Sequence, residues 1–149
     1  MITGTGPRIY SVSPVDAWDL LKQEKGSVLV DVRTQAEWTF VGVPDTSSLG
    51  RAAVFVEWQH WPSMSPNARF VEDLDAELAG RQATALLFLC RSGVRSMAAA
   101  QAVEAAYATK GVDVGCINVS AGFEGDLDAR AQRGSQGGWK KEGLPWRQA

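Results

Sequence analysis

One cysteine in this sequence stands where thiol chemistry is expected. Cys90 directly follows residues 84–89, a strongly apolar run that predicts a buried strand. It begins the run Cys90-Arg91-Ser92-Gly93-Val94-Arg95, after which an alanine-rich stretch with high helix propensity extends from Ser96 to Lys110. Ligands of open parallel sheets bind beyond the carboxyl ends of the strands, so Cys90 lies where a site is expected.

The residues after Cys90 have the composition of an anion-binding loop. Backbone N–H groups at a helix N-terminus bind anions, and Gly93 lets the loop curl because it has no Cβ. Arg91 and Arg95 add two cations that stay protonated. A cysteine that only fills the core would not usually be followed by a cationic glycine loop. We therefore predict that Cys90 is a thiolate nucleophile.

Predicted helices and strands alternate along the chain. Strands are predicted at 27–32, 52–57, 84–89 and 112–119, and helices from Ser13-Pro14 to Gly26, at 35–41, from Pro66-Asn67 to Gly80 and at 96–110, with a turn and a short helix within 120–128. This order predicts one α/β domain over residues 1–149, with a mostly parallel central sheet flanked by helices on both faces. Residues 134–138 form a flexible-looking stretch before a tail with Trp139 and Trp146, which we expect to dock on the domain.

Length and composition exclude several classes of partner. A chain of 149 residues fits one domain, and a net charge of −2 gives no basic field for nucleic acid. No apolar run approaches the roughly 20 residues of a membrane-spanning helix. Residues 1–7 lack the pattern of a secretory signal, and two cysteines do not make a disulfide framework, so we expect a cytoplasmic protein with reduced thiols. The sequence makes no prediction of the oligomeric state.

Three motifs, in the same order along the chain, resemble those of the rhodanese family. The loop from Cys90 is similar to the active-site loop of the family, residues 29–44 to its first signature, and residues 118–123 to its last strand and glycine turn. Residues 138–146 resemble the tail of small bacterial single-domain members. The resemblance implies a rhodanese-like fold and a two-step cycle without metal or cofactor. The Cys90 thiolate takes a sulfur atom from thiosulfate or a persulfide donor, and a thiol or cyanide acceptor then removes it.

The resemblance also implies roles for neighbouring residues. The substrate-binding loop, whose N–H groups would cradle the outer sulfur of the persulfide, consists of Arg91, Ser92, Gly93, Val94, Arg95 and Ser96. Arg91 and Arg95 would attract an anionic donor. Asp31, Arg33 and Glu37 are expected to support the loop through ion pairs, with Asp31 or Glu37 paired to Arg95. Val43 stands where many members have His, so no imidazole role follows.

Two other functions fit the same loop. A cysteine phosphatase or arsenate reductase has a similar strand–loop–helix arrangement, but places five residues between its Cys and Arg, whereas four separate Cys90 from Arg95. The shorter loop favours a single sulfur atom over a tetrahedral oxyanion. The second alternative is a non-catalytic rhodanese-like binding module, although such modules often lack the cysteine.

Four further residues are weaker candidates for a role in the site. His60, the only histidine, is predicted to be a packed loop residue. Trp58 and Trp61 are expected to pack in the core or on the surface rather than to wall the site. Cys116 lies in an apolar strand and is expected to be buried; the alternative is a resolving thiol that forms a disulfide with Cys90.

Overall fold

A computed structural model describes residues 9–148, and at its centre is a five-stranded sheet. The strand order is β1-β8-β7-β2-β4, and every pairing is parallel. These strands are β1 (Tyr10–Val12), β2 (Ser27–Asp31), β4 (Val54–Phe55), β7 (Ala85–Leu89) and β8 (Gly115–Val119). The predicted α/β class with a mostly parallel sheet is confirmed. The segment examined for a secretory signal lies outside the described residues.

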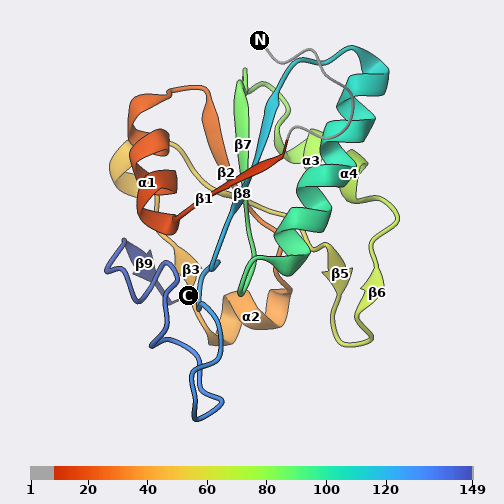
Figure 1. Ribbon diagram of the computed structural model, residues 1–149. Coiled ribbons are helices and arrows are strands. Elements are labelled where there is room, and N and C mark those ends of the chain that lie inside the picture. Colours follow the sequence, from red (N-terminus) through yellow and green to blue (C-terminus); the bar gives the residue numbers. More distant parts are fainter. Residues whose placement is uncertain (1–8, 149) are drawn as a thin grey trace.

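Helices cover both faces of this sheet, as Figure 1 shows. On one face α1 (Pro14–Gln23) packs through Ala17 and Leu21, and on the other lie α3 (Phe70–Glu77) and α4 (Val94–Lys110). A strand covered on both faces must be apolar on both, which explains why β2 and β7 show no alternation. α2 (Gln35–Phe40) lies at the carboxyl edge of the sheet, at the bottom of Figure 1. Within the described residues no helix is long and apolar enough to cross a membrane.

Short-range signals in the sequence determine three helix ends. The Ser13 side chain accepts a hydrogen bond from the backbone N–H of Asp16 at 3.1 Å, and Pro14 occupies the first turn of α1. Thr34 and Glu37 form a capping box at the start of α2. α4 ends at Lys110, as predicted, and Gly111 is its C-cap.

Contacts between distant segments shift several predicted boundaries. α3 begins at Phe70 rather than at Pro66, because β6 (Ser65–Pro66) pairs with β5 (Gln59–His60) in a small hairpin. β8 begins at Gly115 rather than at residue 112, because its pairing with β7 starts there. β4 is only two residues long and pairs with β2 at the sheet edge. α4 begins at residue 94 rather than 96, and residues 120–128 form turns without the predicted short helix.

The C-terminal tail packs beside the carboxyl edge of the sheet. Trp139 is fully buried, and its indole N–H donates to the carbonyl oxygen of Pro145 at 2.7 Å. Further on, β9 (Trp146–Arg147) pairs antiparallel with β3 (Val43–Pro44), and a 3₁₀ turn at Ser47–Leu49 follows β3. A Cβ on Gly138 would lie 2.6 Å from the backbone nitrogen of Gly125. A glycine in the 134–138 stretch therefore permits close packing of the tail.

Candidate active site

Cys90 immediately follows the last residue of β7 and lines a cavity of about 800 Å³ at the carboxyl edge of the sheet. The residue is 1% exposed. The backbone N–H of Gly93 donates to Cys90 Sγ at 3.1 Å, and Ser96 Oγ lies 3.2 Å from the same sulfur. Gly93 is the N-cap of α4, and a helix N-terminus favours negative charge. The Gly93 N–H and the helix N-terminus therefore both direct positive potential toward the sulfur.

The turn after β8 holds the backbone of the cysteine loop. The N–H of Phe123 donates to the carbonyl oxygen of Cys90 at 2.8 Å, and the N–H groups of Glu124 and Gly125 donate to that of Arg91 at 3.0 and 3.2 Å. In a trans peptide the C=O and the next N–H point in opposite directions. The N–H groups of Arg91 and Ser92, which follow these two carbonyls, therefore point away from the turn and make no hydrogen bond to it.

Gly122 makes this close approach of two backbones possible. Its φ is +60°, and a Cβ there would lie 2.4 Å from the carbonyl oxygen of Cys90. Both the left-handed conformation and the lack of space exclude larger residues at this position.

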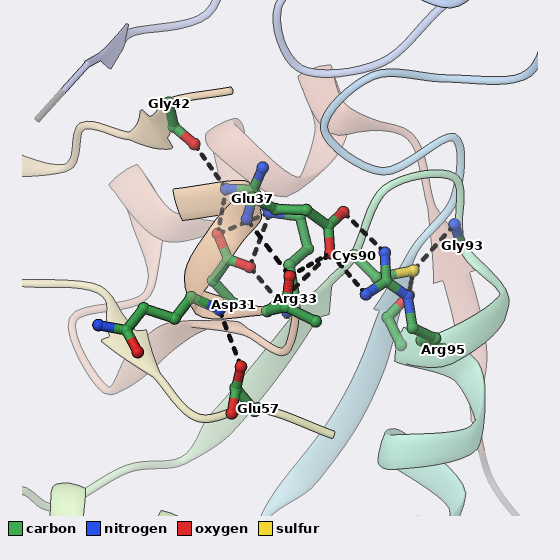
Figure 2. A network of polar contacts seen from close by, with 11 residues as sticks. Asp31, Arg33, Glu37, Gly42, Glu57, Cys90, Gly93 and Arg95 are labelled. Atoms are coloured by element: carbon green, nitrogen blue, oxygen red, sulfur yellow. Dashed lines mark hydrogen bonds and ion pairs between the residues drawn. The ribbon is translucent and has the colours of Figure 1, made fainter. Parts of the chain in front are cut away.

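A buried ion pair supports this turn from the other side. Asp31 and Arg33 are both fully buried, with Arg33 Nη2 2.7 Å from Asp31 Oδ2 (Figure 2). Arg33 Nη2 also donates to the carbonyl oxygen of Gly42 at 2.8 Å. The guanidinium lies 4.3 Å from the ring centre of Phe123, whose N–H holds Cys90. Arg33 thus contacts the residue whose N–H holds the cysteine loop, and no hydrogen bond joins Asp31 or Arg33 to the sulfur.

Glu37 is the carboxylate that pairs with Arg95. Its two oxygens accept hydrogen bonds from Arg95 Nη1 and Nη2 at 2.7 and 2.8 Å, joining α2 to the first turn of α4 (Figure 2). Burial alone would raise the pKa of Glu37, but the hydrogen bonds and charge of Arg95, with hydrogen bonds from Thr34, outweigh it and lower the pKa to about 2. Glu37 also raises the pKa of Arg95 against the opposing effect of burial. The pair stays ionised at neutral pH.

Of the two carboxylates predicted to pair with Arg95, Glu37 does so, and Asp31 pairs with Arg33 instead. Both terminal nitrogens of Arg95 donate to Glu37, so its charge is compensated and its guanidinium is joined to α2. The other arginines that line the cavity are Arg91, which is exposed, and Arg133, whose Nη1 donates to the carbonyl oxygen of Gly125 at 2.8 Å. No motif in the sequence indicated Arg133, because it reaches the cavity from the tail.

Apolar side chains line the cavity, and among Phe40, Trp61, Met64 and Val94 only Val94 belongs to the loop that the sequence assigned to the site. Phe40 and Val94 are 78% exposed and Trp61 is 58% exposed, and Met64 lines the cavity beside them. The expectation that Trp61 packs away from the site is wrong, because the β5–β6 hairpin carries it to the cavity. Trp58 does pack in the core, edge to face with Phe70 at 5.1 Å. We call Phe40, Trp61, Met64 and Val94 the apolar rim.

His60 and Cys116 lie away from the cysteine loop. The prediction of a packed His60 is wrong: its side chain is half exposed and its Nδ1 lies 3.2 Å from Glu57 Oε1. Cys116 is buried, as predicted, and burial raises its pKa to about 12. It pairs with Leu86, four residues before Cys90, which is about 13 Å along the strand direction. The alternative of a disulfide between the two cysteines is therefore wrong.

A parallel α/β domain with a cysteine in a strand–loop–helix turn defines a class of proteins that bind an anionic group at the carboxyl edge of the sheet. Among the described residues, no three His, Cys, Asp or Glu side chains are grouped to hold a metal. The family model of the rhodanese-like domain matches residues 13–129. The chain belongs to the rhodanese-like domain family.

Relatives and solved structures of similar sequence span nearly the whole chain. The uncharacterized protein RP600 of Rickettsia prowazekii is 32% identical over 141 residues, which cover 93% of this chain and 97% of that protein. The uncharacterized protein RC0915 of Rickettsia conorii is 31% identical over the same length. The crystal structure of Rv0390 from M. tuberculosis is 45% identical, covers 94% of this chain and 98% of its own, and has a TM-score of 0.78.

A more distant structure has the same fold. The polysulfide-sulfur transferase homodimer from Wolinella succinogenes is 22% identical, with 95% of this chain and 80% of that chain covered and a TM-score of 0.53. At this identity the likeness concerns the fold alone.

Proposed function

We propose that this protein is a sulfurtransferase that carries sulfane sulfur as a persulfide on Cys90. The observation that supports the proposal best is the contact of Cys90 Sγ with the N–H of Gly93, at 3.1 Å and at the N-terminus of a long helix. The family of the chain and the Wolinella succinogenes protein of the same fold, a polysulfide-sulfur transferase, agree with this chemistry.

The proposed cycle has two steps and needs no metal or cofactor. The Cys90 thiolate attacks the outer sulfur of thiosulfate or a similar donor, the Sγ–S bond forms, and the S–S bond of the donor breaks with its electron pair leaving on sulfite. A thiolate or cyanide then attacks the outer sulfur of the persulfide, and the Sγ–S bond breaks with its electron pair returning to Cys90. Unpaired cysteines stay reduced in the cytoplasm, so we also propose the cytoplasm as its location.

The surroundings of Cys90 favour sulfur transfer over the two alternatives. A phosphatase binds the oxyanion with the arginine at the end of its cysteine loop, whereas the terminal nitrogens of Arg95 are both engaged by Glu37. A binding module has no need of a cysteine sulfur held by a backbone amide.

The proposal is tested by measuring the intact mass of the protein after incubation with thiosulfate. We expect a gain of one sulfur atom that an acceptor such as cyanide removes, that is absent in Cys90→Ala and that persists in Cys116→Ala. If neither thiosulfate nor a persulfide or polysulfide donor adds sulfur to the folded wild-type protein, the proposal is wrong and the binding module is favoured. Turnover of p-nitrophenyl phosphate that disappears in Cys90→Ser would instead indicate a phosphatase.

A further inference from the structure

A chain of polar side chains runs from the edge of the sheet to the Cys90 sulfur. Ser96 Oγ lies 3.2 Å from Cys90 Sγ and donates a hydrogen bond to Asn118 Oδ1 at 2.6 Å. Asn118 Nδ2 in turn donates to Ser11 Oγ at 3.2 Å. Ser96 and Asn118 are 0% and 4% exposed, whereas Ser11 is exposed on the edge strand β1. We call these three side chains the serine–asparagine relay.

In this arrangement the relay suits a protonated Cys90. A serine hydroxyl has one proton, and the proton of Ser96 is directed at Asn118. Ser96 Oγ therefore directs a lone pair toward Sγ. Cys90 can donate a hydrogen bond to this lone pair only as a thiol. A thiolate would place two acceptors 3.2 Å apart in a buried site, which is costly.

The relay can reverse its direction without moving its atoms far. A half-turn of the Asn118 side-chain amide exchanges its oxygen and nitrogen, which have nearly the same shape. The amide N–H then donates to Ser96 Oγ, and the hydroxyl of Ser96 donates to Sγ. Ser11, which has a hydroxyl proton of its own, donates to the amide oxygen. Every polar atom of the relay is satisfied in both directions, the second of which suits a thiolate.

We propose that Ser96 is a catalytic residue for sulfur release and that Asn118 is the positioning residue that reverses the relay. This proposal rests on the proposed sulfurtransferase function. When the acceptor thiolate attacks the outer sulfur, a new S–S bond forms to the acceptor. The Sγ–S bond breaks, and its electron pair becomes the thiolate charge on Cys90. The Ser96 hydroxyl stabilises this charge by donating a hydrogen bond, and its proton stays on Oγ.

The relay affects the two half-reactions unequally. In sulfur loading, a hydrogen bond to the thiolate increases the fraction of thiolate but lowers its nucleophilicity, so the two effects largely cancel. In sulfur release, Cys90 is the leaving group, and the same hydrogen bond grows stronger as the charge develops. In a ping-pong mechanism, kcat/KM for the donor and kcat/KM for the acceptor report the two half-reactions separately.

The variants Ser96→Ala and Asn118→Asp test the relay. Ser96→Ala removes the hydroxyl that donates to the sulfur. In Asn118→Asp the carboxylate can only accept a hydrogen bond, so it keeps the single proton of the Ser96 hydroxyl directed toward itself and away from the sulfur. At pH 8 we expect kcat/KM for a thiol acceptor to fall about tenfold or more in both variants, and kcat/KM for thiosulfate to change by less than about threefold. In Asn118→Asp, the rate of release relative to wild type should recover as the pH falls, because a protonated carboxyl group can donate to Ser96.

Ser120→Ala is the matched control, because this hydroxyl at the same sheet edge donates to the carbonyl oxygen of Val12. It should leave both kinetic constants near those of wild type. Circular dichroism and thermal unfolding establish that each variant is folded; if Asn118→Asp is not, Ser96→Ala decides alone. Release from preloaded Ser96→Ala at the wild-type rate would overturn the relay and leave the proposed function intact. If the wild-type protein gains no sulfur, the proposed function itself fails.

Discussion

The ion pair between Glu37 and Arg95 offers a direct test of how the cysteine loop is held. Replacing Glu37 with Gln removes the charge, but Gln can still make the capping box with Thr34 at the start of α2. The substitution therefore isolates the ion pair from the local stability of the helix.

The pKa of Glu37 gives the expected magnitude. Its value of about 2 in the folded protein compares with an ordinary value of 4.5. At about 1.4 kcal/mol per pKa unit, the ionised carboxylate contributes about 3 kcal/mol to the free energy of unfolding. The two side chains are only 18% and 15% exposed, so screening by solvent is limited.

The assay is urea unfolding of wild type and Glu37→Gln between pH 7 and pH 2. Because the folded pKa lies below the unfolded one, the contribution of Glu37 is fully present above about pH 4.5. It is lost as the pH falls toward 2. Because Gln keeps the hydrogen bonds with Thr34, the variant should be about 1–3 kcal/mol less stable at pH 7, and the two proteins should converge as the pH approaches 2.

A surface ion pair provides the control. Glu72 lies 3.2 Å from Arg69, and both side chains are more than 60% exposed, so Glu72→Gln should change the free energy of unfolding by less than about 0.5 kcal/mol. The reasoning is refuted if Glu37→Gln is as stable as Glu72→Gln at pH 7, or if its difference from wild type does not depend on pH.

Three further predictions concern the loop, the tail and the apolar rim. Gly122→Ala should displace the Cys90 carbonyl and slow sulfur loading about a hundredfold, measured by intact mass against time; loading at the wild-type rate would contradict this. Trp139→Ala should lower the free energy of unfolding, measured in urea, by about 3–5 kcal/mol, because it empties a buried site. Trp61→Ala should change this free energy little, and equal effects of the two substitutions would show that the tail is not part of the core. Phe40→Ala and Trp61→Ala should raise KM for an aromatic thiol about tenfold and leave KM for cyanide unchanged; equal changes would exclude the rim as a contact of the acceptor.

The fold was predictable where the signals are short-range in the chain. Ser13-Pro14 and Thr34 through Glu37 contain their own helix caps, and strands 27–31 and 85–89 show no polar–apolar alternation because they are covered on both faces. The edge strands were harder to predict. β1 and β9 contain three and two residues, and each exists because a distant segment supplies hydrogen bonds to it.

The sequence by itself determined the loop that surrounds Cys90, because the cysteine, the glycine and the start of the helix are contiguous and their geometry is local. Only the tertiary structure decided which groups surround it. Arg95 pairs with Glu37, which is 58 residues away in the chain. Asp31 is not available to Arg95, because its carboxylate is already paired with Arg33 just after the end of β2. Ser96 contacts Asn118, and Arg133 reaches the cavity, only because segments far apart in the sequence are brought together when the whole molecule packs.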